Sequence, residues 1–182
     1  MNIETTNIQD LLIINPAVFE DGRGYFFEAY NQNTLSSLGV TINFVQDNQS
    51  RSSKGVLRGL HMQRGSAAQA KLVRVLEGAV LDVVVDLRKG SASFGQHFTI
   101  ELTAENHKQF FVPAGFAHGF VVLSESATFF YKVDKFYEPG DEVGIMYNDK
   151  DLNIDWKLAT SELIFSEKDK TLGSFAEYAA SL

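Results

Sequence analysis

The chain has 182 residues, 45% of them apolar, with fifteen phenylalanines, three prolines and no cysteine, so it is long enough for one domain with its own hydrophobic core. The absence of cysteine excludes disulfides and thiolate chemistry, and the net charge of -7 disfavours a nucleic-acid-binding surface, which needs clustered Lys and Arg. We expect a cytoplasmic protein with no membrane partner, because no apolar run approaches the roughly 20 residues that cross a bilayer and the N-terminus lacks a signal-peptide pattern.

Short runs of β-forming residues recur along the chain between Gly, Asn and Asp turn signals. A short helix is predicted at 35–39, ending at Gly39, and the polar tail is predicted to end in a second helix. Glu77 and Gly78 are typical of a hairpin turn. In chain order, the predicted strands are 11–14, 25–30, 42–48, 55–63, 71–76, 79–87, 95–102, 108–113, 119–124 and 127–136. About ten strands without long helices between them predict a single all-β domain over residues 1–182, a sandwich or barrel of jelly-roll type with short peripheral helices.

Three polar side chains, those of His61, Lys71 and Tyr131, fall on faces of these strands that otherwise look like barrel interior. Side chains alternate between the two faces of a strand. His61 and Gln63 therefore point the same way, Lys71 lies on the apolar face of 71–76, and Tyr131 lies on the apolar face of 127–136.

Arg58 should point away from His61 by the same alternation, unless Gly59 marks a bulge.

The stretch "HMQRGSAAQAKLVRVLEG" at 61–78 resembles the first metal-binding motif of cupins, with two ligands replaced. Gln63 stands where cupins have a second His, and Lys71 stands where they have a Glu. "PAGFAHGFV" resembles the second motif and keeps His118. A Lys would repel a divalent cation, so we expect a metal-free pocket that contains a fixed cation.

A His, a Lys and a Tyr in an apolar barrel suit proton abstraction next to a carbonyl. His61 could take the proton, Lys71 could stabilise the enolate oxygen, and Tyr131 could return a proton from the opposite face. The alternative for each residue taken singly is structural, such as a hydrogen-bonded core His or a buried ion pair. Arg23, in the turn "DGRG", could present its guanidinium to a phosphate or be a solvated hairpin residue.

Eight segments, in order along the chain, resemble the dTDP-4-dehydrorhamnose 3,5-epimerase family, and the resemblance runs from about residue 3 to residue 170. They are "DGRGYFFE", "FVQDNQSRSSKGVLRGLHMQ", "QAKLVRVLEG", "DVVVDLR", "SFGQ", "FFVPAGFAHGF", "YKVDKFY" and "SEKD". The resemblance implies a cupin-like jelly-roll homodimer that exchanges strands and uses no metal or other cofactor. It also implies a dTDP-4-keto-6-deoxy sugar as substrate, on the route to dTDP-L-rhamnose.

The same resemblance implies a role for each matching residue. His61 would be the general base, oriented by Asp169; Tyr131 would be the acid, and Lys71 would hold the C4 oxygen. The residues implied to contact the substrate are Arg23, Phe26, Glu28, Gln46, Asn48, Arg58, Gln63, His118, Glu142 and Lys168.

The sequence leaves the exact reaction open. The loop "RGSAA" departs from a usually proline-containing segment of the family, and Trp156 is not followed by the usual Pro. A single-centre epimerase or a ketoisomerase would carry similar residues, and only product analysis separates them. A non-catalytic sugar-binding cupin and a metal-dependent cupin oxygenase are the remaining alternatives.

Overall fold

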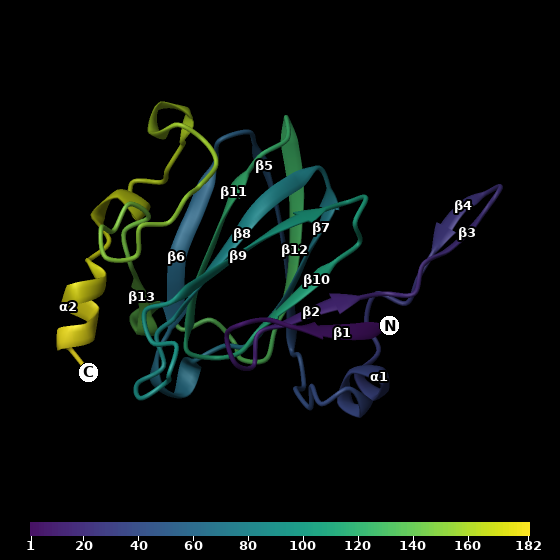
Figure 1. Cartoon of the computed structure of the whole chain (residues 1–182), viewed down its shortest axis with the longest axis horizontal. Coiled ribbons are helices and arrows are strands. Elements are labelled where there is room, and N and C mark those ends of the chain that lie inside the picture. The colour runs from purple at the N-terminus through teal and green to yellow at the C-terminus, as the bar shows by residue number, and fades with distance from the viewer.

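Two antiparallel sheets pack against each other in the computed structural model, which describes all 182 residues (Figure 1). The larger sheet has six strands, in the spatial order β1 (Asn2–Thr5), β2 (Leu12–Asn15), β10 (Gln109–Val112), β7 (Lys71–Glu77), β12 (Ser126–Val133) and β5 (Gln46–Ser53). The smaller sheet has five, in the order β13 (Glu142–Gly144), β6 (Leu57–Gln63), β11 (Phe116–Val122), β8 (Ala79–Asp86) and β9 (His97–Thr103). The predicted all-β jelly roll is confirmed.

The remaining elements are short and peripheral. A separate hairpin of β3 (Phe19–Asp21) and β4 (Gly24–Phe26) projects from the body of the molecule (Figure 1). The helices are α1 (Gln32–Ser37) and α2 (Phe175–Ala180), and the 3-10 turns are η1 (Gly65–Ala67), η2 (Pro139–Asp141), η3 (Thr160–Glu162) and η4 (Asp169–Thr171). None of the helices is long and apolar enough to cross a membrane.

Alternation on each strand divides the apolar side chains between three clusters. The largest, with 15 buried residues, lies between the two sheets and includes Val73 of β7 and Phe129 of β12. A second, with 12 buried residues, lies on the other face of the five-stranded sheet, where Ile145, Leu152 and Trp156 of the C-terminal third cover it. The third, with six buried residues, joins the other sheet to α1. The C-terminal segment is therefore held against the barrel by a core of its own.

Most predicted strands are confirmed with small shifts at their ends, but two differ. The strand expected at 42–48 runs instead from Gln46 to Ser53, because the polar stretch "QDNQSRSS" pairs along the whole of β12 as an edge strand. The run 25–30 contributes only its first two residues to β4. Strands β1, β3 and β13 were not predicted.

The predicted helices and hairpin turn are present. α1 begins three residues earlier than expected because the side chain of Asn31 accepts hydrogen bonds from the backbone N–H groups of Asn33 and Thr34. The hairpin turn at Gly78 is confirmed, with the residue in the left-handed region (φ +77°) that favours glycine.

Candidate active site

A β-bulge in β6 brings Arg58 and His61 onto the same face of the sheet. His118 of β11 pairs with His61 and Phe120 pairs with Arg58, so two steps on β11 oppose three steps on β6. Leu57 and Leu60 accordingly both pack in the second cluster, on the face of the five-stranded sheet that points away from the cavity. A bulge at Gly59 therefore explains why Arg58 lies on the same face as His61 although simple alternation predicts the opposite.

Glycine is required at the bulge for two reasons. Gly59 has a φ of +127°, which other residues adopt only with strain. A Cβ atom at this position would lie 2.5 Å from the Cα of Gly119 in the neighbouring strand.

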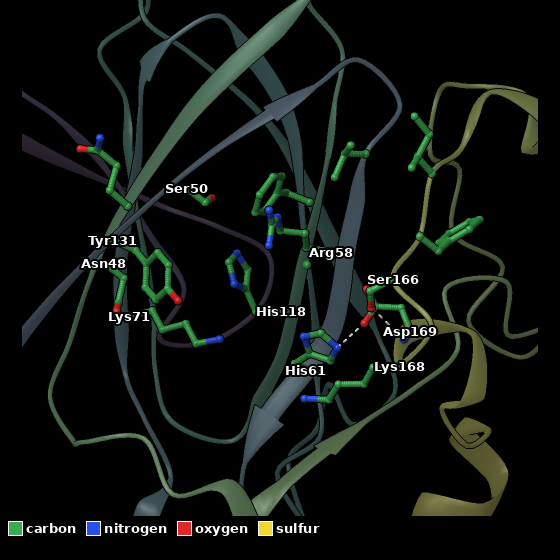
Figure 2. Close-up of a pocket in the computed structure, with 16 residues that line it drawn as sticks. Asn48, Ser50, Arg58, His61, Lys71, His118, Tyr131, Ser166, Lys168 and Asp169 are labelled. Atoms are coloured by element: carbon green, nitrogen blue, oxygen red, sulfur yellow. Dashed lines mark hydrogen bonds and ion pairs between the residues drawn. The ribbon is translucent and has the colours of Figure 1, made fainter.

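The bulge faces a cavity of about 580 Å³ that opens between the two sheets. Figure 2 shows Tyr131 and Lys71 entering it from one side and His61 from the other. The cavity lining is made of Asn48, Gln49, Ser50, Val56, Arg58, His61, Lys71, His118, Gly119, Phe120, Tyr131, Ile164, Phe165, Ser166, Lys168 and Asp169. Eight of the fourteen residues singled out from sequence are therefore in one place.

The His61 imidazole is paired with a buried carboxylate. Its Nε2 lies 2.6 Å from Oδ1 of Asp169, whose side chain is only 4% exposed (Figure 2). Burial lowers the pKa of His61 below its ordinary value, and the carboxylates of Asp169 and Glu142 oppose this. A neutral imidazole that is oriented by a carboxylate is able to accept a proton near neutral pH.

Asp169 reaches His61 from a segment outside both sheets. The segment is held by two isolated parallel bridges, from Val56 to Ile164 and from Ile145 to Gly173. The backbone N–H of Asp169 donates to Oγ of Ser166 (3.1 Å), which fixes the turn that presents the carboxylate.

Lys71 places a cation in the cavity without a close carboxylate. It lies on β7 next to the inter-sheet core, and no carboxylate oxygen lies within 4.0 Å of its ammonium. Burial lowers the pKa of Lys71 to about 8, although the more distant carboxylates of Asp82 and Glu142 raise it. An ammonium held in this way is available to a ligand oxygen that gains negative charge.

Tyr131 lies on β12 in the opposite sheet from His61, and its ring packs against the inter-sheet core. Burial raises the pKa of its phenol, while the guanidinium of Arg58 opposes the shift. The phenol is therefore protonated near neutral pH and can donate a proton to the face of a ligand opposite to His61.

Of the other predicted contact residues, Asn48, Arg58, His118 and Lys168 line the cavity. Gln46 lies beside it and donates a hydrogen bond from Nε2 to Oδ1 of Asn48 (2.8 Å).

Glu142 is not one of the lining residues, but it forms an ion pair with Lys168, which lines the cavity. It also accepts a hydrogen bond from the hydroxyl of Tyr137 (2.7 Å). Gln63 is buried away from the cavity, with its Oε1 accepting from the backbone N–H of Glu138 (2.8 Å).

The hairpin residues predicted to bind substrate do not reach this cavity. Arg23 pairs with Asp21 at the tip of the projecting hairpin, and Phe26 is 71% exposed beside it. Glu28 follows the hairpin and accepts hydrogen bonds from Asn31 and Thr34 at the start of α1.

Asp82 belongs to the site although it was not predicted from the sequence. It is fully buried on β8, and both of its carboxylate oxygens lie within 3.0 Å of Nε2 of His118. The signal was available in the sequence: Asp82 alternates with Val80 and Val84, which both lie in the inter-sheet core. A carboxylate in such a row is costly unless it is paired, so it points to a polar partner inside the barrel.

The structure contains no group of three or more His, Asp or Glu side chains arranged to hold a metal ion. Lys71 occupies the position at which the cupin motif has a carboxylate, as the sequence indicates.

The chain is similar to known proteins over almost its whole length. Residues 5–177 match the family model described as dTDP-4-dehydrorhamnose 3,5-epimerase. The curated protein of that name from Escherichia coli strain K12 is 52% identical over 178 residues, which cover 97% of this chain and 96% of the relative.

Two solved structures show the same fold. The dTDP-4-dehydrorhamnose 3,5-epimerase from Elizabethkingia anophelis is 54% identical with a TM-score of 0.94, and 97% of each chain is covered. The dTDP-6-deoxy-D-glucose-3,5-epimerase from Legionella pneumophila, solved in complex with dTDP-4-keto-L-rhamnose, is 47% identical with a TM-score of 0.90, covering 97% of this chain and 96% of the other.

Proposed function

Because the chain belongs to the dTDP-4-dehydrorhamnose 3,5-epimerase family, we propose that it inverts C3 and C5 of dTDP-4-keto-6-deoxy-D-glucose to give dTDP-4-keto-L-rhamnose. One observation carries the mechanism: a carboxylate-oriented His61 faces Tyr131 across a cavity that also contains the ammonium of Lys71 (Figure 2). This arrangement supports removal of a proton on one face of a carbon and return of a proton on the other.

His61 is the base in this proposal. It takes the proton from the carbon next to the C4 ketone, and the C–H electron pair moves to the ketone oxygen to form an enolate. Asp169 stabilises the imidazolium that results. Lys71 stabilises the negative oxygen, and this interaction is stronger in a partly buried cavity than in water.

Tyr131 then gives its phenolic proton to the opposite face of the same carbon as the enolate returns to the ketone. The step breaks one C–H bond and forms another, with no net oxidation. Exchange with solvent returns a proton to Tyr131 and removes one from His61. Because C3 and C5 both flank the ketone, the same groups can act at each carbon, and the reaction requires no cofactor.

Proton NMR of dTDP-4-keto-6-deoxyglucose in D₂O, with the protein and a chelator present, tests the proposal. We expect deuterium at both C3 and C5 and the signals of the L-lyxo product. Deuterium at one carbon only would instead identify a single-centre epimerase, and no exchange at either carbon would contradict the proposed activity. His61→Asn should abolish the exchange, whereas His97→Asn, in β9 outside the cavity, should leave it unchanged.

We further propose that the active unit is a homodimer in which the β3–β4 hairpin of each chain completes the substrate site of its partner. The support is the position of the hairpin, which projects from the barrel (Figure 1). Its side chains Phe19, Tyr25 and Phe26 are each at least 60% exposed. Surfaces this apolar on a protruding hairpin favour a protein contact. Arg23 and Phe26 would then contact the nucleotide part of the substrate from the second chain.

Light scattering should give twice the chain mass of 20.2 kDa. Co-expression of a chain carrying Arg23→Ala with a chain carrying His61→Asn separates the two possibilities for the hairpin. If hairpins are exchanged, mixed dimers contain one intact site and activity rises above that of either variant alone. If each hairpin served its own chain, no mixed dimer would have an intact site, and activity would not recover.

We propose that this enzyme acts in the cytoplasm, in keeping with a chain that has no cysteine.

A further inference from the structure

Asp82 is the one fully buried carboxylate next to the cavity that the proposed mechanism leaves without a role. It lies on β8, where it pairs in register with Phe120 of β11. His118 is two residues away on β11, so the two side chains are diagonal neighbours on one face of the sheet. This face is the apolar one that packs between the sheets, which makes an ionisable pair there costly unless it has a function.

The contact between the two residues determines how His118 can meet a ligand. Nε2 of His118 lies 3.0 and 2.9 Å from the two carboxylate oxygens of Asp82. Burial raises the pKa of Asp82, while His118 and Lys71 lower it. An ionised carboxylate only accepts hydrogen bonds, so with Asp82 ionised Nε2 of His118 carries the proton that it donates, and Nδ1 is the ring nitrogen that remains for a ligand. His118 lines the cavity (Figure 2). Asp82 therefore acts on the cavity through its contact with His118.

Asp82 also acts on Lys71, without direct contact. No carboxylate oxygen lies within 4.0 Å of the Lys71 ammonium, so no ion pair withdraws it from the cavity. The negative charges that favour its protonated form are those of Asp82 and Glu142. The other ionisable groups around the cavity are Arg58, His61, His118, Tyr131, Lys168 and Asp169.

We propose that Asp82 is a positioning residue: its buried carboxylate orients the His118 ring and provides a negative charge beside the cavity that Lys71 enters. The effect on catalysis rests on the proposed function, because Lys71 must be charged to stabilise the enolate oxygen. Neither carboxylate oxygen touches the substrate. The separation between Asp82 and Lys71 matters, since a direct ion pair would compete with the substrate oxygen for the ammonium.

Asp82→Asn keeps the shape of the side chain and removes its charge. We expect kcat to fall by about 10- to 100-fold, the size of effect found when the carboxylate that orients a metal-binding His is removed. The high-pH limb of kcat/KM should move to lower pH, because Lys71 then loses its proton more easily. The matched control is Asp86→Asn, which removes a second fully buried carboxylate from the same strand, where it is bound to Arg88, Ser91 and Ser93. It should lower the thermal stability without moving the pH profile.

An unchanged pH profile in Asp82→Asn would overturn the proposal even if kcat fell, because a purely structural role predicts that result. The same shift in Asp86→Asn would overturn it as well.

NMR of the unmodified protein provides a test that does not depend on the variant folding or on turnover. Nitrogen-15 spectra should show the His118 proton on Nε2, and a neutral ring with its proton on Nδ1 would overturn the proposal. Failure of the proposed function would be recognised separately, as a wild-type protein that exchanges no substrate proton while His118 still carries its proton on Nε2.

Discussion

Replacing Lys71 with methionine should abolish epimerisation and stabilise the fold. Burial lowers the pKa of Lys71 from 10.5 to about 8, which means that the folded protein holds this ammonium at a cost. At about 1.4 kcal/mol per pKa unit, the difference corresponds to about 3 kcal/mol at neutral pH. Methionine is similar in length and apolar, so it fills the same space between the sheets without the charge. We expect Tm to rise by about 6 to 12 °C for a chain of this size.

The pH dependence of this gain identifies its cause. Between pH 8 and pH 10.5 the unfolded chain still holds the Lys71 proton while the folded chain releases it, so the wild-type protein gains stability as pH rises through this window. Urea unfolding at pH 7 and pH 10 should therefore show a large advantage for Lys71→Met at pH 7 and a small one at pH 10. Lys150→Met, at an exposed position without an ion pair, should show no pH-dependent difference from wild type. A Lys71→Met protein that is less stable than wild type at pH 7, or equally stabilised at both pH values, would refute the reasoning.

Three other substitutions test the remaining parts of the site. Tyr131→Phe should continue to exchange substrate protons with D₂O while forming no inverted product, because the base is intact and the acid is lost; loss of exchange as well would argue for a different role. Asp169→Asn should lower kcat and move the low-pH limb of kcat/KM to lower pH, since Asp169 raises the pKa of His61 and the neutral imidazole is the active form; a limb that moves to higher pH would contradict this pairing. Gly59→Ala should destabilise the protein or prevent folding, as measured by urea unfolding, because its Cβ would lie 2.5 Å from Cα of Gly119; wild-type stability would show that the bulge tolerates a side chain.

The sequence by itself determined the β architecture and the inward positions of the functional side chains. Two-residue alternation is a local property of a strand, so it placed Lys71 and Tyr131 on faces that do line the cavity. The replacement of a cupin Glu by Lys71 could also be recognised from the sequence, because it depends only on residue type and spacing. The edge strand β5 was misplaced for the opposite reason: its residues are polar, and only pairing with β12 holds them in a strand.

Tertiary structure decided which of those inward residues meet. The extra residue in β6 turns Arg58 and His61 to one side, a result that alternation alone could not settle. Asp169 reaches His61 across 108 residues of sequence, through a segment that packs on the barrel rather than in it. Asp82 and His118 meet only because β8 and β11 are neighbours in the sheet. Residue type and the local alternation of side chains can be read from the sequence. Which side chains meet in a long-range contact depends on strand register and on the packing of distant segments, and both are properties of the folded chain.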